Sequence, residues 1–210
     1  MSLPLPSTLK RFFVTEIYSV DLAGTPAVDA QLHALDGLCR AMAQKDTEGQ
    51  AWSRQQGYVG YTSYGSVRDL PNLAPPFGDL KTLIDEHVAV FARQLELDLQ
   101  NHPLAMQTSW VNILAPLGAH SSHFHPKCVI SGTFYISIPP GASAIQFEDP
   151  RLPLMMHAPT RTSGARPDRQ FHAEVTPARG TLLLWESWLR HEVPTNRASE
   201  PRISISFNYA

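Results

Sequence analysis

The sequence has little cysteine, almost no net charge and no long apolar run. Its two cysteines, Cys39 and Cys128, form neither a C-x-x-C pair nor a dense framework, which argues against a disulfide-stabilised fold or thiolate zinc. The formal net charge of -2 marks no surface for nucleic acid or anionic lipid. No segment is long and apolar enough for a membrane span or for the core of a signal peptide. We expect a cytoplasmic protein that binds neither nucleic acid nor membrane.

Length and composition indicate one globular domain. Hydrophobic residues make up 43% of the 210 residues and charged residues 17%, which is ordinary for a folded chain and unlike a disordered one. A chain of this length buries one sizeable core but is short for two. We therefore predict a single domain over residues 1–210, with a helical support region at 1–103 and a strand-rich core at 104–210.

The first half predicts two helices around a long loop. Residues 10–20 are rich in aromatic and β-branched types and indicate an opening strand. Apolar residues recur at helical spacing over residues 26–44 and again over residues 77–99, which predicts an amphipathic helix in each range. Residues 50–75 are rich in Gly, Ser, Tyr and Pro and indicate a loop, which we expect to act as a lid.

From Gln107 onward the chain consists of short strand-like runs separated by turn residues. The runs are SWVNILAP, CVISGTFYISI, SAIQFED, QFHAEVTP, GTLLLWES and RISISFNY. Helices followed by many short strands predict an antiparallel α+β fold, mainly β, in which the helices cover one face of a sandwich or open barrel.

Three histidines in the strand region are candidate metal ligands. His123 and His125 are two positions apart, so on an extended segment both side chains point to the same side. His191 follows the run GTLLLW and would join them through the fold. Imidazole suits iron, zinc, copper and nickel, so the ligand type does not choose the metal. Taken alone, the H-x-H pair is also explained by two half-exposed strand histidines.

Arg202 and Ser204 strengthen the case for a ligand site. Arg202 begins the alternating run RISISFN, and its guanidinium can grip a carboxylate with two hydrogen bonds. Ser204 shares its face of the strand and could bond the same carboxylate. The plain alternative is a surface arginine and an ordinary strand serine.

Two long motifs, HFHPKCVISGTFYISIPPGASAIQFEDPRLPLMM and LLLWESWLRHEVPTN followed by EPRISISFN, resemble a bacterial family of Fe(II)/2-oxoglutarate-dependent oxygenases, mostly of unassigned substrate. The helical half, with GYVGYTS, resembles it as well, so the likeness spans most of the chain. It implies a double-stranded β-helix, the jelly-roll or cupin-like fold, with the N-terminal helices packed on one sheet.

The resemblance also implies the roles of individual residues. His123 and His125 match the proximal ligands of Fe(II), and His191 matches the distal ligand. Arg202 matches the residue that pairs with the far carboxylate of 2-oxoglutarate, the co-substrate, and Tyr135 matches a strand tyrosine that bonds the same carboxylate. Asn112, which shares a strand face with Trp110, is expected to line the cavity.

The sequence departs from the superfamily at His125, where most members have Asp or Glu, so the metal site would be all histidine. His120 is a fourth candidate, which we expect beside the metal or facing the substrate.

The expected reaction is hydroxylation of an unidentified small molecule or protein side chain, with dioxygen and 2-oxoglutarate consumed and succinate formed. Two alternatives stay open: a three-histidine cupin-like dioxygenase that uses no 2-oxoglutarate, and a non-catalytic metal-binding protein of the same fold. The aromatic-rich helical half could also supply the face of a homodimer.

Overall fold

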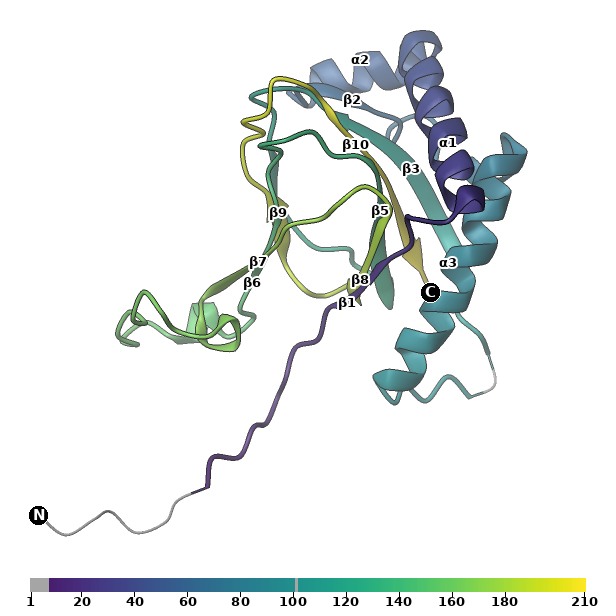
Figure 1. The fold of residues 1–210 in the computed structure, drawn as a ribbon. Helices are drawn as coiled ribbons and strands as arrows, with labels where there is room; N and C mark the ends of the chain where they lie inside the picture. Colours follow the sequence, from purple (N-terminus) through teal and green to yellow (C-terminus); the bar gives the residue numbers. More distant parts are fainter. Residues whose placement is uncertain (1–7, 101) are drawn as a thin grey trace, which may run out of the picture.

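A computed structural model of the chain describes residues 8–100 and 102–210. Two antiparallel sheets face each other, and helices cover the outer face of the larger sheet (Figure 1). The larger sheet contains, in order, β1 (Tyr18–Asp21), β8 (Thr181–Glu186), β5 (Ile130–Ser137), β10 (Arg202–Tyr209), β3 (Met106–Leu114) and β2 (Gly60–Thr62). The smaller contains β4 (His120–His123), β9 (His191–Val193), β6 (Ile145–Glu148) and β7 (His172–Val175). The predicted fold class, a mainly-β double-stranded β-helix, is confirmed.

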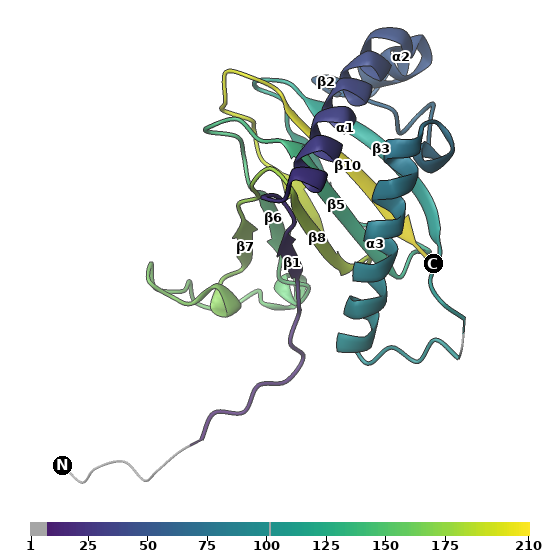
Figure 2. The same cartoon turned by 45° about the vertical axis from the view of Figure 1, so that its right-hand side comes forward.

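Three α-helices support the larger sheet. They are α1 (Pro26–Lys45), α2 (Thr47–Gln55) and α3 (Pro75–Gln94), and Figure 2 shows α1 and α3 lying across the strands of this sheet. The helix predicted over residues 26–44 is confirmed within one residue, because its apolar stripe packs into the core through Leu32, Leu35 and Cys39. None of the described helices is long and apolar enough to cross a membrane.

Strand β10 separates the apolar core from the space between the sheets. Its residues alternate: Ile203, Ile205 and Phe207 belong to the core beneath the helices, whereas Arg202, Ser204 and Ser206 line a pocket on the other face. This period of two is what a strand between two different surroundings requires. The polar face of β10 therefore becomes the floor of the pocket.

Two predicted boundaries were wrong. The opening strand covers only Tyr18–Asp21, because residues 10–16 are exposed and residues 10–17 pair with no described strand. Phe13, for example, is 90% exposed. The second helix ends at Gln94 and not at residue 99, since Glu96 adopts a left-handed backbone with φ 55°.

The predicted loop over residues 50–75 is only partly a loop. Its first residues, up to Gln55, continue helix α2, whose start is capped by Asp46: this carboxylate accepts a hydrogen bond of 2.9 Å from the Gly49 backbone N–H. The segment also contains β2 and a 3-10 turn at Leu70–Asn72. What is left as irregular chain is the stretch around Tyr58 and the turns after Thr62.

Candidate metal and co-substrate site

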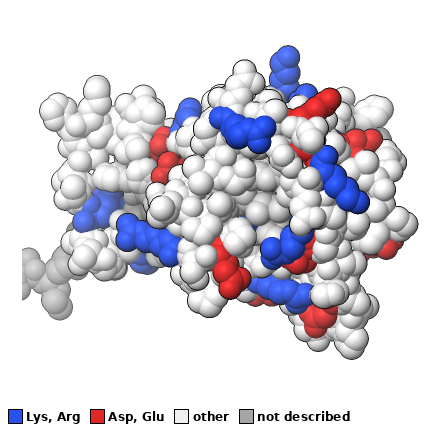
Figure 3. Space-filling view, turned by 90° about the horizontal axis from the view of Figure 1, so that it is seen from above, with Lys and Arg blue, Asp and Glu red and all other residues white. Residues whose placement is uncertain are grey.

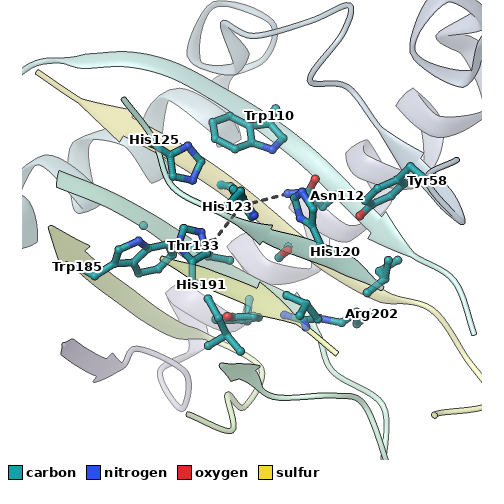
Figure 4. A pocket seen from close by; sticks show the side chains of 17 residues that line it. Tyr58, Trp110, Asn112, His120, His123, His125, Thr133, Trp185, His191 and Arg202 are labelled. Carbon is teal, nitrogen blue, oxygen red and sulfur yellow. Dashed lines mark hydrogen bonds between the residues drawn. The ribbon is translucent and has the colours of Figure 1, made fainter. Parts of the chain in front are cut away.

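The three candidate histidines meet at one end of the two sheets (Figure 4). His123 is the last residue of β4, His191 is the first of β9, and their Cα atoms are register partners in the antiparallel pair. His125 lies beyond the end of β4, in the segment before β5, where its backbone N–H donates to the Ser187 carbonyl at 2.9 Å. The prediction of both residues on one strand was wrong at His125, because the strand ends earlier.

Each histidine offers one ring nitrogen to the same space. These atoms all lie within 4.8 Å of one another, a spacing that one metal ion can bridge. The Nδ1 atom of His123 lies 2.7 Å from the Ser121 carbonyl, and that of His191 lies 2.9 Å from the Leu189 carbonyl. Donation of Nδ1–H to these carbonyls leaves Nε2 of both rings as the ligand atom. Within the described chain, the ring of His125 has no such partner.

The three imidazoles are held neutral, which metal binding requires. Burial, with a smaller effect of the neighbouring His123, lowers the pKa of His191 to about 3. Burial, with a smaller effect of His123, lowers the pKa of His125 to about 4. Burial also lowers the pKa of His123, and the nearby positive charge of Arg190 acts in the same direction.

The seven residues expected to bind the metal or the co-substrate all line one pocket of about 520 Å³, part of which is open to solvent. Three of them form a row across the larger sheet, because Ser204 of β10 is the register partner of Asn112 on β3 and of Tyr135 on β5. The seven are Asn112, His123, His125, Tyr135, His191, Arg202 and Ser204. The fold thus gathers them at one place, while their roles remain predictions.

Arg202 is a buried charge without a counter-ion. Only 4% of the residue is exposed, and no carboxylate of the described residues lies within 4.0 Å of its guanidinium. One guanidinium N–H donates to the Ser143 carbonyl at 3.1 Å, and the group lies 5.2 Å from the centroid of the Tyr135 ring. An unpaired buried charge is costly, so this position fits a carboxylate supplied by a ligand.

The hydroxyl of Tyr135 is the second unsatisfied group. Tyr135 is fully buried and its hydroxyl has no hydrogen-bond partner among the described residues. Burial raises the pKa of this phenol, against the smaller opposing effect of Arg202, so it stays a donor. A buried donor beside an unpaired guanidinium offers two contacts to one carboxylate.

Hydrogen bonds between side chains hold the pocket floor in place. Thr62 of β2 donates to the Asn112 side chain at 2.9 Å, and the Asn112 amide donates to Ser206 at 3.1 Å. The Ser206 and Thr133 hydroxyls lie 3.0 Å apart. This network orients Asn112 before any ligand binds.

Tyr58 and His120 complete the wall, and sequence reasoning did not select Tyr58. The His120 ring stacks on His123 with centroids 4.3 Å apart, and the Tyr58 ring meets His120 edge-on at 5.8 Å. His120 does not belong to the three-histidine group. The sequence analysis had likewise placed it beside the metal ligands and not among them. Tyr58 stands in the predicted lid, but nothing in GYVGY distinguishes it from the neighbouring tyrosine.

Comparison with known proteins agrees with this geometry. Residues 108–208 match the family model described as "Putative 2OG-Fe(II) oxygenase". No curated protein matches the chain.

Solved structures share the fold at low identity. A prolyl-4-hydroxylase from Pseudomonas putida matches 93% of this chain and 92% of its own with a TM-score of 0.63 and 14% identity. HygX from Streptomyces hygroscopicus, solved with nickel and 2-oxoglutarate bound, matches 93% of this chain and 82% of its own, with a TM-score of 0.58 and 13% identity. A less complete match is an oxidoreductase of the 2OG-Fe(II) oxygenase family from Burkholderia pseudomallei. The match covers 66% of this chain and 59% of the oxidoreductase, with a TM-score of 0.47 and 17% identity.

The fold and the clustered histidines define a double-stranded β-helix protein with a candidate three-histidine metal site. The strand-rich part of the chain, from β3 to β10, matches the family model of the 2OG-Fe(II) oxygenases. Fe(II) and 2-oxoglutarate are the cofactor and co-substrate of this family, and the donor set fits both groups: three neutral imidazoles for the metal, and a buried guanidinium with a free phenol for a carboxylate.

Proposed function

We propose that the chain is an Fe(II)- and 2-oxoglutarate-dependent oxygenase that hydroxylates a substrate still to be identified. One observation carries the proposal: the unpaired, buried guanidinium of Arg202 lines the same pocket as the three-histidine cluster. A metal site alone would serve many activities. A metal site that shares its pocket with an unpaired carboxylate receptor fits a dicarboxylic co-substrate.

His123, His125 and His191 would hold the metal as three neutral ligands, leaving positions for other ligands on it. Fe(II) with 2-oxoglutarate supplies the redox chemistry: one dioxygen is consumed, 2-oxoglutarate loses carbon dioxide and becomes succinate, and the substrate gains one oxygen atom. The backbone carbonyls of Ser121 and Leu189 fix the ring orientation of His123 and His191.

Arg202 and Tyr135 would bind the far carboxylate of 2-oxoglutarate. The guanidinium gains the counter-ion that it lacks, and the Tyr135 hydroxyl gains an acceptor. Ser204 and Asn112, which are register partners, would contribute hydrogen bonds along the same wall. The network through Thr62 keeps Asn112 in place, so little reorganisation is needed on binding.

A three-histidine dioxygenase without 2-oxoglutarate is the second candidate, and the histidine at position 125 favours it. Replacement of Arg202 discriminates between the two. If 2-oxoglutarate is a co-substrate, Arg202→Gln raises the concentration of 2-oxoglutarate that oxygen consumption requires; if the substrate itself chelates the metal, oxygen consumption is unchanged by this variant. Metal binding without succinate formation would indicate the non-catalytic alternative.

The direct test follows oxygen consumption and succinate in the Fe(II)-loaded protein with 2-oxoglutarate, where slow turnover without a prime substrate is expected. Succinate in proportion to oxygen supports the proposal, and its loss in Arg202→Gln assigns the residue. No succinate from protein that has bound both iron and 2-oxoglutarate would contradict it.

Four further points belong to the same proposal. Residues 1–103 and 104–210 would form a single domain, which is supported by one apolar core that takes residues from both parts. A cytoplasmic location is supported by two free thiols, Cys39 and Cys128. The absence of a nucleic-acid partner is supported by the charges of one face, where basic and acidic side chains are interspersed (Figure 3). A homodimer through the helical half remains a proposal to be tested by light scattering.

A further inference from the structure

A row of aromatic side chains leads from a candidate metal ligand to the protein surface. The ring centroids of His125 and Trp110 lie 5.9 Å apart, and Figure 4 shows the two side chains next to each other. The Trp110 ring lies 5.1 Å from that of Tyr64, and the Tyr64 ring lies 5.7 Å from that of Trp52. Trp110 is buried and lines the pocket, whereas Tyr64 is 39% exposed. The row therefore joins the interior of the metal site to solvent.

Hydrogen bonds and close packing hold the outer rings of this row in place. The backbone N–H of Val111 in β3 donates to the Ser63 hydroxyl at 3.1 Å, and the Ser63 backbone N–H donates to the Val111 carbonyl at 3.0 Å. These two bonds fix the turn that carries Tyr64. Trp52 lies against Gly65, where an added Cβ atom would come within 2.1 Å of the indole ring. The turn and helix α2 thus keep both outer rings at defined positions.

The residue types in the row suit electron transfer. Indole and phenol are the aromatic side chains that lose an electron most readily, and all three centroid distances are those of packed ring pairs. The buried indole of Trp110 can lose an electron without transferring a proton. A phenol releases its proton when it is oxidised, and the exposed Tyr64 can release it to water. An oxidisable ring thus lies at each step between the metal ligand and solvent.

The aromatic contacts of the other two candidate ligands do not provide an equivalent route. His191 contacts Trp185 at 4.7 Å, but Trp185 is 1% exposed and belongs to a buried apolar cluster. His123 contacts His120, which contacts Tyr58, and an imidazole is much harder to oxidise than an indole. Among the described residues, the row that starts at the third histidine is the one whose oxidisable rings continue to an exposed tyrosine.

We propose that Trp110, Tyr64 and Trp52 carry electrons from the surface to the metal site when 2-oxoglutarate is consumed without a prime substrate. This inference rests on the proposed function, because that reaction supplies the oxidant. The consequence is protection of the pocket: the row reduces the oxidised site before the metal ligands are damaged.

Turnover without a substrate produces succinate and carbon dioxide and leaves an oxidising equivalent of two electrons at the metal site. Trp110 donates one electron to the site, and Tyr64 reduces the oxidised indole while its phenol proton passes to water. A soluble reductant such as ascorbate then reduces the Tyr64 radical. A second passage supplies the second electron, and with two protons from solvent the remaining oxygen atom of dioxygen leaves as water. Without a reductant, Tyr64 and the adjacent Trp52 share the radical.

The test exposes protein loaded with Fe(II) and 2-oxoglutarate to dioxygen, without prime substrate and without ascorbate. Freeze-quenched samples are measured by electron paramagnetic resonance and the final products by peptide mass mapping, and both signals are divided by the succinate formed. We expect a tyrosyl radical in the unmodified protein and covalent oxidation at Tyr64 and Trp52. Ascorbate should suppress both.

Tyr64→Phe interrupts the row with little change in shape. The tyrosyl radical should disappear in this variant. Covalent oxidation of Trp110 should rise severalfold and persist in the presence of ascorbate, because the oxidised indole has lost its electron donor. Tyr58→Phe is the matched control: Tyr58 also lies near the cluster, 5.8 Å from the His120 ring, but outside the row, so its loss should leave the radical in place.

Trp188 is an internal control in the same peptide map. It is 48% exposed, more than Tyr64, and lies three residues before His191 in the chain, but it does not belong to the row. An oxidant that diffuses through solvent would modify Trp188 at least as strongly as Trp52, whereas transfer along the row spares it.

A tyrosyl radical that survives Tyr64→Phe, equal oxidation of Trp188 and Trp52, or succinate formation without a radical or oxidation in the row would overturn the inference. Failure of the proposed function is a different result: no succinate would be formed at all, and the inference would fall with it.

Discussion

His123 and His191 face each other across the antiparallel pair of β4 and β9, with ring centroids 4.3 Å apart. Both rings are oriented by a backbone carbonyl two residues earlier in the chain, Ser121 for one and Leu189 for the other. His125 faces the same space from outside the strand and without such a bond. The triad therefore consists of two rings fixed by backbone hydrogen bonds and one ring held by packing.

This asymmetry predicts unequal contributions to metal binding. A hydrogen bond that orients a ligand histidine changes metal affinity about 10- to 100-fold. We expect His123→Ala and His191→Ala to weaken Co(II) binding about tenfold more than His125→Ala does. Competition with a chelating dye measures all three affinities. His172→Ala, an exposed histidine on β7, is the control, and equal losses in the three variants would refute the asymmetry.

Replacement of Arg202 should separate ligand binding from stability. Hydrogen bonds to a charged group contribute about 1.5–3 kcal/mol, so Arg202→Gln is expected to weaken 2-oxoglutarate binding roughly 10- to 100-fold. Because the free protein holds this guanidinium buried and unpaired, Arg202→Met should not lower the free energy of unfolding without ligand. Urea unfolding and calorimetric titration test the two parts. Marked destabilisation of the ligand-free Arg202→Met protein would indicate a structural role instead.

Acid should destabilise the metal-free protein through its neutral histidines. The pKa of His120 and of His191 is lowered from 6.5 to about 3, mainly by burial. In the unfolded chain these groups take up protons below about pH 6.5, whereas the folded protein does so only near pH 3. The contribution of these histidines to the free energy of unfolding is therefore fully present above pH 6.5, and it is lost progressively as the pH decreases toward 3.

Urea unfolding of the metal-free protein from pH 7 to pH 4 checks this. The double variant His120→Gln/His191→Gln should lose less stability over this interval than the unmodified protein does. The same slope in both would show that other groups dominate.

Packing beneath the pocket leaves no room at Gly132. A Cβ atom built on this residue of β5 would lie 2.5 Å from the ring of Phe207 and 2.6 Å from Leu184. Gly132→Ala therefore forces core side chains to shift, and we expect it to lower the free energy of unfolding by about 1–3 kcal/mol. Gly37→Ala is the control, since nothing lies within 4 Å of its added methyl group. Equal unfolding midpoints in urea would contradict the prediction.

The sequence predicted those elements in which one face is buried. The helix over residues 26–44 was identifiable because its apolar stripe packs on the sheet, and the face shared by Arg202 and Ser204 followed from strand alternation. The length of the opening strand was overestimated, because the β propensity of residues 10–17 does not reveal whether a partner strand exists. The start of α2 could have been predicted from Asp46, a residue type that often caps helices. The Gly- and Ser-rich composition of residues 50–75 led instead to the prediction of a loop.

The site was predictable residue by residue but not in its geometry. Spacing indicated His123 and His125, but only the fold shows that β4 ends between them. Tyr58 was missed because its contact with His120 depends on the path of a loop. Loops lack the regular spacing of apolar residues by which helices and strands are predicted.

The most direct measurement is the visible charge-transfer absorption of the protein with Fe(II) and 2-oxoglutarate under anaerobic conditions. We predict a band in the unmodified protein that weakens in His191→Ala, which loses a metal ligand, and in Arg202→Gln, which loses the receptor for the co-substrate. His172→Ala should keep the full band. Bound iron without any band in the presence of saturating 2-oxoglutarate would contradict the assignment of this pocket as an Fe(II)/2-oxoglutarate site.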